Sequence, residues 1–320
     1  MHRTDRYPYI GIRTKYELAK RIASAALPYP KALALINDAL VNFDRYWYDS
    51  KDSKPAEEKF VRSAVGNSLG KLLQLIDRRV LAPHDNRVPG FIFGGLSGKD
   101  HIQAARHLLG IKRERRLLRL DIKRFFEQIH EERVFHLFYS KCGCSVEGAR
   151  LLAQLCCVPS GAKGSTSEER GLARGFATSP RLSLWCNLDT FLRVHWKASR
   201  QLKNHDPRVV IFVDDVGVTA SRVTHQEMEI LSKALEDILA GFDHNQPLRI
   251  NVRKKEILAG DKLEHLGIRL GRNKLSLGAK SRSRMEVVKN RLKGGLPREE
   301  RTKLKRKLRS YKAYKRQVQT

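Results

Sequence analysis

Apolar residues recur at helical spacing through the N-terminal part of the chain. Between residues 14 and 48 these residues are Leu18, Ile22, Leu33, Ile36, Leu40 and Phe43. Pro28 and Pro30 fall inside this run, and a proline in a helical pattern ends the helix. The pattern therefore predicts two helices over 14–48, and it continues as a helix over 57–82.

Four later segments have the same period and predict helices of their own. They are 100–109, 131–157, 180–199 and 224–241. Pro180 suits the first turn of its helix, because the N–H that proline lacks would be unpaired there. Loops rich in glycine, proline and polar residues are predicted between the helices, at 82–100 and 158–180.

Shorter apolar runs predict strands. Leu117, Leu118 and Leu120 indicate a buried strand that ends at Asp121, with a helix directly after it. The segment 208–221 predicts a strand, a turn and a second strand. Further short strands are predicted at 248–252, 263–270 and 273–278.

The strand–turn–strand segment places two adjacent acids, Asp214 and Asp215, among apolar residues. Buried carboxylates are costly unless they are paired or bind a metal. If the strand that ends at Asp121 meets this pair, three carboxylates repel one another until cations neutralise them. Mg²⁺ suits carboxylate and phosphate oxygens at once, and two such ions about 3.5–4 Å apart stabilise in-line phosphoryl transfer. For an isolated Asp-Asp pair, a solvated turn is the alternative.

Charge sets this chain apart from enzymes that act on small metabolites. Its 320 residues contain 63 Lys and Arg against 34 Asp and Glu, a net charge of +29. This excess predicts a polyanionic partner, with nucleic acid favoured over a membrane surface. The sequence has no apolar run of about 18 residues and no continuous apolar segment typical of a signal peptide. We therefore expect a cytoplasmic protein without a membrane partner.

The positive charge is most concentrated towards the C-terminus. Residues 272–320 contain 18 Lys and Arg but only 3 Glu. Leu304, Leu308 and Tyr311 form a narrow apolar stripe on an otherwise basic helix. A solvated face usually mixes both signs of charge, so this segment indicates contact with a nucleic-acid backbone.

The cysteines predict neither a disulfide framework nor a zinc site. Their number is odd, and four of the five cluster with the spacings C-x-C and C-C rather than C-x2-C. They are Cys142, Cys144, Cys156, Cys157 and Cys186. We expect buried small hydrophobic side chains in a reducing compartment.

Five segments occur in a characteristic order: RLLRLDIKRFFEQI, GLARGFATSPRLSLWCN, FVDD, LRINVRKKEI and HLGI. Together they resemble the motifs of the bacterial reverse transcriptases of retrons, group II introns and defence systems. Each motif is weak alone, and the five together are strong. An upstream segment, FGGLSGKDHIQAARH, is similar to one found in retron-like enzymes. The same segment is one residue too short for a P-loop and has Asp100 where Ser or Thr is required.

The resemblance implies an α+β fold of the right-hand polymerase type, with an antiparallel palm sheet flanked by helices. It implies an N-terminal helical region and fingers over residues 1–110. The palm would span 111–270, with a fingers insertion around 158–178, and a short basic helical thumb would span 271–320.

The resemblance also implies roles for individual residues. Asp121 and Asp214 would bridge two Mg²⁺, with Mn²⁺ as the alternative ion, and Asp215 would be the more peripheral third carboxylate. Ile122 would offer its backbone carbonyl to one metal. Phe126 would be the steric gate that excludes a ribose 2′-OH, with a core phenylalanine as the alternative.

Further positions would bind the nucleotide. Gly175 would let backbone approach the nucleotide or template, and Lys254 would lie near the triphosphate, with Lys255 as its competitor. Basic residues of the fingers are candidates for the incoming phosphates: Lys59, Arg62, Arg78 and Arg79. Contact with the nucleic-acid backbone is expected from Arg174, Arg282, Arg284, Lys305, Arg306 and Arg309.

The expected activity is RNA-directed DNA synthesis from dNTPs, on a dedicated noncoding RNA and in antiphage defence, with DNA as the product. An effector protein or a second copy of the chain is the expected protein partner. Ala173 and Arg174 replace the family's Pro-Gln, Phe212 replaces the commoner Tyr, and Gln103 replaces Asn. Alternatives left open are untemplated or protein-primed DNA synthesis, RNA-templated RNA synthesis, and an idle RNA-binding scaffold.

Overall fold

The computed structural model describes residues 6–111, 114–244, 247–295 and 297–320. These residues form two compact units, each built from three segments of the chain. Unit 1 comprises Met1–Gly98, Ile122–Leu192 and Leu239–Arg249, and unit 2 comprises Lys99–Asp121, Arg193–Ile238 and Ile250–Thr320. Two of the boundaries fall inside the helices α9 (Leu188–Gln201) and α10 (His225–Gly241), so continuous helices lead from one unit into the other. The predicted limits of fingers, palm and thumb stay a prediction.

Unit 1 is mainly helical, with short antiparallel strand pairs. Its helices are α1 (Lys15–Ile22), α2 (Tyr29–Val41), α3 (Phe43–Tyr46), α4 (Ser68–Ile76), α6 (Glu131–His136), α7 (Val146–Cys156) and α8 (Ser179–Cys186). Its strands are β1 (Tyr48–Asp49), β2 (Arg62–Ser63), β3 (Ile92–Phe93), β5 (Cys157–Pro159) and β6 (Arg170–Leu172), and β1 pairs with β2 and β5 with β6. Tighter or wider turns occupy Pro55–Glu57, Asp77–Leu81, Ala82–Arg87 and Leu137–Lys141.

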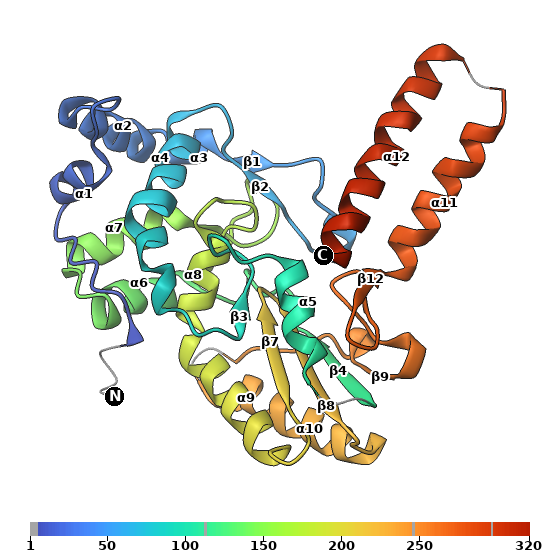
Figure 1. Cartoon of the computed structure of the whole chain (residues 1–320). Helices are drawn as coiled ribbons and strands as arrows, with labels where there is room; N and C mark the ends of the chain where they lie inside the picture. The colour runs from blue at the N-terminus through green and yellow to red at the C-terminus, as the bar shows by residue number, and fades with distance from the viewer. Residues whose placement is uncertain (1–5, 112–113, 245–246, 296) are drawn as a thin grey trace. The chain divides into compact units, whose positions relative to one another are not determined.

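Unit 2 is built around an antiparallel sheet (Figure 1). Four of its strands run in the order β7 (Arg208–Phe212), β8 (Asp215–Ser221), β4 (Arg115–Asp121) and β9 (Glu256–Ala259). Leu118, Val210 and Val218 are fully buried on these strands. Helix α5 (His101–Leu109) packs against β7 and β8, and α10 contributes buried Met228 and Leu235.

The C-terminal part of unit 2 holds a second small sheet and a helical hairpin. The sheet contains β10 (Glu264–His265), β11 (Ile268–Leu270) and β12 (Leu275–Leu277), all antiparallel. The long helices α11 (Ala279–Lys293) and α12 (Arg298–Gln319) follow, and Figure 1 shows them side by side. The ring of Tyr314 on α12 stacks on that of His101 on α5, and the two side chains share a 2.8 Å hydrogen bond.

The mixed α+β composition predicted from the sequence is confirmed, and several elements lie where they were predicted. The helix over 100–109 is present as α5, with Asp100 as its N-cap in a capping box with Gln103. The helix over 224–241 is α10. Strand 117–121 and the strand–turn–strand over 208–221 are β4 and the β7–β8 hairpin.

Three predicted elements are wrong. No helix follows Asp121, because Arg124 has a positive φ of 51° and residues 123–129 form turns. The helix over 57–82 begins only at Ser68, because Glu58 and Gly66 also have positive φ and the β1–β2 pair precedes it. Residues 248–252 form no strand, and the Asn251 N–H donates instead to the Asp121 carbonyl at 2.7 Å.

Two helices predicted as continuous are interrupted. Gly143, with a φ of 69°, separates the turn at Leu137–Lys141 from α7 within 131–157. Asn187 separates α8 from α9 within 180–199, and its side-chain amide donates to the Ser183 carbonyl at 2.8 Å. The four clustered cysteines are buried as predicted, and Cys186 is partly buried.

Candidate active site

The two adjacent acids lie at a tight turn between β7 and β8. Phe212 pairs with Asp215 across the hairpin, so Val213 and Asp214 are the two residues of the turn. Val213 has a φ of 57°, in the left-handed region that a β-branched residue rarely adopts. Two-residue hairpin loops favour positive φ because it matches the twist of the strands, and glycine usually supplies it. The valine is therefore held in a strained conformation beside the carboxylates.

The third acid faces this hairpin from the neighbouring strand. Asp121 is the last residue of β4 and pairs directly with Asp215, the first residue of β8. Side chains at directly opposed positions of an antiparallel pair lie on the same face of the sheet. The register of β4 and β8 therefore brings Asp121 and Asp215 together at one end of the sheet, with Asp214 next in the chain.

Asn251 and Lys254 hold Asp121 from a third segment of unit 2. The Asn251 side-chain amide donates to Asp121 Oδ1 at 3.3 Å, in addition to its backbone hydrogen bond. A turn at Val252–Lys254 brings the Lys254 Nζ to 2.6 Å from the same oxygen. The hydrogen bond and charge of Asp121 raise the pKa of Lys254, which keeps the ammonium protonated. This pair offsets part of the negative charge of the carboxylates.

The electrostatics of the three acids are those of a crowded anionic site. Burial, followed by the negative charges of Asp214 and Asp121, raises the pKa of Asp215 from its usual 3.8 to about 7. Arg119 and Lys254 act in the opposite direction. The raised pKa therefore reflects burial first and repulsion among the carboxylates second, and a bound cation would favour the ionised form of all three.

The donor set suits a hard divalent cation. Asp121, Asp214 and Asp215 supply carboxylate oxygens, the ligands that Mg²⁺ prefers, and none is a soft sulfur or imidazole donor. Within residues 6–111, 114–244, 247–295 and 297–320, no group of three or more His, Cys, Asp or Glu side chains is already arranged to hold a metal ion. Ile122, the other predicted metal ligand, follows Asp121 in the chain, and its side chain is buried.

The structure separates the two candidate lysines. Lys254 contacts Asp121, whereas Lys255 forms an ion pair with Glu236 of α10 at 2.9 Å. Their side chains thus point to different partners although the residues are adjacent. Lys254 is therefore the lysine that lies at the carboxylates.

Phe126 and Arg174, predicted to contact the nucleotide and the nucleic acid, form one cluster in unit 1. The Arg174 guanidinium lies over the Phe126 ring, 5.1 Å from its centroid. The same guanidinium binds both carboxylate oxygens of Glu127, at 3.0 and 3.1 Å. Phe126 is buried, with 8% of its surface exposed, so this environment also suits the core phenylalanine that was the alternative to a steric gate. The gate stays a prediction.

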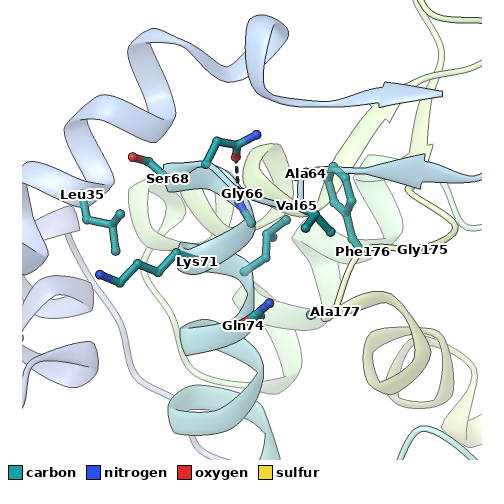
Figure 2. Close-up of a pocket in the computed structure, with 13 residues that line it drawn as sticks. Leu35, Ala64, Val65, Gly66, Ser68, Lys71, Gln74, Gly175, Phe176 and Ala177 are labelled. Carbon is teal, nitrogen blue, oxygen red and sulfur yellow. Dashed lines mark hydrogen bonds between the residues drawn. The ribbon is translucent and has the colours of Figure 1, made fainter. Parts of the chain in front are cut away.

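Gly175 lines a cavity of about 610 Å³ in unit 1 (Figure 2). Figure 2 shows Ala64 and Val65, on the segment before α4, beside Phe176, with Leu35 and Lys71 at the other end of the cavity. The φ of Gly175 is 102°, and a Cβ there would lie 2.4 Å from the Arg62 carbonyl oxygen. Glycine is therefore required at this position by the protein's own backbone, whatever the cavity binds.

The four basic residues predicted to bind phosphates differ in their surroundings. Arg62 is buried and bonds to Asp49 and to the carbonyl of Gly161, and burial lowers its pKa to about 10. Arg79 donates to the carbonyls of Ile22 and Ala23 at 2.6 and 2.7 Å. Lys59 is half-buried, and Arg78 is exposed. Arg62 and Arg79 thus have structural partners inside unit 1.

The predicted backbone-binding residues of the C-terminal hairpin all lie at the surface. Arg282 and Arg284 on α11 are exposed, as are Lys305, Arg306 and Arg309 on α12. The apolar stripe on α12 is half-buried, and Val318 near its end is buried. The predicted division of α12 into an apolar docking face and a basic outer face is therefore present.

Two groups at the carboxylates were not singled out from the sequence. Asn251 was part of a recognised motif, but a predicted strand gave no reason for it to contact Asp121. Arg119 shares the face of Asp121 on β4, donates to the Glu264 carbonyl at 3.1 Å and lowers the pKa of Asp215. Its signal was a lone arginine two residues before the acid, a pattern too common to stand out.

Comparison of the chain with models of known protein families, and with curated proteins, gives no match. Among the described residues, no helix has both the length and the apolar character needed to cross a membrane.

Proposed function

We propose that the protein is an RNA-directed DNA polymerase that extends a 3′-hydroxyl with dNTPs. The observation that carries this proposal is the meeting of Asp121, Asp214 and Asp215 at one end of an antiparallel sheet, with Lys254 bound to Asp121. Other enzymes could use such a site, and the reverse-transcriptase-like motifs are the reason for proposing a polymerase. Function in antiphage defence, with a dedicated noncoding RNA, belongs to the same proposal.

In this function Asp121 and Asp214 would hold the metal ions, with the Ile122 carbonyl and Asp215 beside them. Two Mg²⁺, when bound, would activate the 3′-hydroxyl and stabilise the charge that develops on the α-phosphate. The strained turn fixes Asp214 on a rigid hairpin, and Asn251 orients the Asp121 carboxylate. Lys254, protonated through its contact with Asp121, is placed to turn to an incoming triphosphate and donate a proton to the departing pyrophosphate.

The direct test measures incorporation of labelled dNTP on a primed RNA template in Mg²⁺. We expect Asp214→Asn to reduce incorporation by at least about a thousandfold, because it removes a metal-bridging carboxylate but keeps the shape of the side chain. The matched control is Asp237→Asn, which makes the same change at an exposed position of α10. Normal incorporation by Asp214→Asn would refute the catalytic role of the site, and no incorporation by the unmodified protein with either Mg²⁺ or Mn²⁺ would refute the polymerase proposal.

A second candidate is DNA synthesis without an ordinary template. The observation that favours it is Arg174, which replaces the family's Gln and is tied to Glu127 and Phe126 rather than extending into solvent. Sequencing the products made on a template of known sequence separates the two. Products complementary to the template support the first proposal, and repetitive or unrelated sequence supports the second.

A further inference from the structure

The exposed side of α9 carries an arginine–tryptophan–arginine stack that the proposed chemistry does not use. Trp196 is 43% exposed. The Arg193 guanidinium lies 4.5 Å from the centroid of the Trp196 rings, and the Arg200 guanidinium lies 5.0 Å from it. Their spacings of three and four residues place the three side chains on one helical face. We call Arg193, Trp196 and Arg200 the α9 surface.

The surroundings of the α9 surface are positively charged. From Thr190 to His205 the chain contains four Lys or Arg and no Asp or Glu. Burial lowers the pKa of His107 on α5, and the nearby positive charges of Arg208, His195 and Lys99 lower this pKa further. Along the part of α9 that belongs to unit 2, the charged side chains are therefore all positive. A face that was merely solvated would usually mix both signs of charge.

The α9 surface is separate from the carboxylates. The chain runs from α9 to Arg208, the first residue of β7, whereas Asp214 lies two residues beyond Phe212, the last residue of that strand. Five residues of strand span about 16 Å. Figure 1 shows α9 beside the end of the sheet where β7 begins. A ligand on α9 would thus lie away from the reacting groups.

The stack has the chemistry of a preformed nucleic-acid contact. A guanidinium held over an indole ring can keep its N–H groups directed to solvent, where they can form paired hydrogen bonds with a phosphate. The ring also reduces the rotational freedom that each arginine would lose on binding. A single-stranded nucleic acid offers both phosphates for the arginines and flat bases for the tryptophan. An acidic protein surface, the alternative partner, would offer negative charge to the arginines but no base for the tryptophan.

We propose that the α9 surface binds a single-stranded segment of RNA outside the polymerase site. Arg193 and Arg200 would contact two phosphates, and Trp196 would hold both guanidiniums in position and offer its exposed edge to a base. The choice of RNA as the partner rests on the proposed function, in which the protein carries a structured RNA. The contact would retain that RNA while its template region moves through the active site.

The test compares binding of fluorescent oligouridylate, without primer, over a range of salt concentrations. Arg193→Gln with Arg200→Gln should flatten the slope of log K against log salt by about 1.4, or about 0.7 for each lost phosphate. Trp196→Ala, which keeps every charge, should weaken binding about fivefold at fixed salt, because both arginines lose the ring that holds them in position and must be ordered on binding. Lys233→Gln, an exposed charge change on α10, is the control and should bind like the unmodified protein.

The same variants are assayed for dNTP incorporation on a short primer–template, where the double arginine variant should match the unmodified protein. If its oligouridylate affinity and salt slope equal those of Lys233→Gln, the α9 proposal is overturned, which is also the result expected if an acidic protein binds there. If the double arginine variant loses incorporation on the short primer–template to the same extent as it loses RNA binding, the claim that the α9 surface is separate from the polymerase site is overturned. Failure of the polymerase proposal has a different signature, namely that the unmodified protein incorporates no dNTP with either Mg²⁺ or Mn²⁺ while its oligouridylate binding still responds to the α9 substitutions.

Discussion

Lys254 and Lys255 are adjacent and chemically identical, yet they have different partners. Lys254 neutralises Asp121, and Lys255 ties the same turn to Glu236 on α10. The sequence could place a lysine near the carboxylates but could not choose between the two. The choice depends on a turn at Val252–Lys254, which begins where the predicted strand over 248–252 was expected to end.

This difference gives a matched pair of variants. Lys254→Ala should lower dNTP incorporation about a hundredfold, the effect expected for loss of a general acid. Lys255→Ala, which loses an ion pair away from Asp121, should change it less than about threefold. The measurement is the single-turnover rate at saturating dNTP. Equal effects of the two substitutions would contradict the assignment of Lys254 to the site.

The raised pKa of Asp215 makes the metal-free protein sensitive to pH. The folded protein holds this proton up to about pH 7, whereas the unfolded chain releases it near its usual pKa of 3.8. Between these values the folded state binds more protons, so the free energy of unfolding falls as the pH rises. The contribution is fully present below about pH 4 and is lost through pH 7, at about 1.4 kcal/mol for each pKa unit of the shift.

Asp215→Asn removes the titrating group but keeps its shape. In EDTA, we expect the stability gained by this variant over the unmodified protein to be larger at pH 8 than at pH 5. Thermal unfolding of both proteins at the two pH values measures this gain. Mg²⁺ should reduce the stability difference between the two proteins at pH 8. A stability difference that stays the same at both pH values would show that Asp215 does not bind its proton more tightly in the folded state.

At the scale of elements, the β7–β8 hairpin combines a predictable strand pair with an unpredictable turn. The apolar run correctly predicted two strands, but the turn predicted at Asp214 and Asp215 lies one residue earlier, at Val213 and Asp214, because Asp215 already begins β8. The run gave no sign that a valine adopts a positive φ, since local propensity favours a glycine or an asparagine there. The register imposed by β4, which pairs Asp121 with Asp215, leaves only Val213 and Asp214 to complete the turn.

Replacing this valine should therefore separate stability from function. Val213→Gly should raise the free energy of unfolding by about 1 kcal/mol, because relief of the positive φ outweighs the flexibility that glycine adds to the unfolded chain. Incorporation should fall as Asp214 becomes less rigidly held. The control is Val287→Gly on the exposed side of α11, where the same substitution should destabilise by about 1 kcal/mol. Destabilisation by both would contradict strain at Val213.

At the scale of the whole molecule, charge is the dominant property. The net charge of +29 is unevenly distributed, and the α11–α12 hairpin carries a large share on exposed helical faces. Contacts with phosphates release counterions, so binding that uses these faces must weaken steeply with salt.

A triple substitution on α12 tests whether these charges act locally. Lys305→Gln, Arg306→Gln and Arg309→Gln together should flatten the salt dependence of primer–template binding by about 2 in log–log slope. Lys20→Gln, Lys31→Gln and Lys233→Gln remove the same net charge from exposed positions on other helices and should leave the slope nearly unchanged. Equal slopes for the two triple variants would mean that net charge, not the C-terminal hairpin, governs binding.

The sequence by itself determined the identity of the three acids, the strands that carry them and the basic C-terminal helices. These features follow from apolar periodicity and charge, which act over a few residues. Only the tertiary structure decided that Lys254 and Asn251 contact Asp121, that Val213 is strained, that Arg62 and Arg174 have partners in unit 1, and that Trp196 is exposed between two arginines. The contacts and the strain depend on which distant segments meet and in what register, and no local pattern encodes that. The spacing of Trp196 and its two arginines is local, but its exposure depends on which face of α9 packs against the rest of the protein.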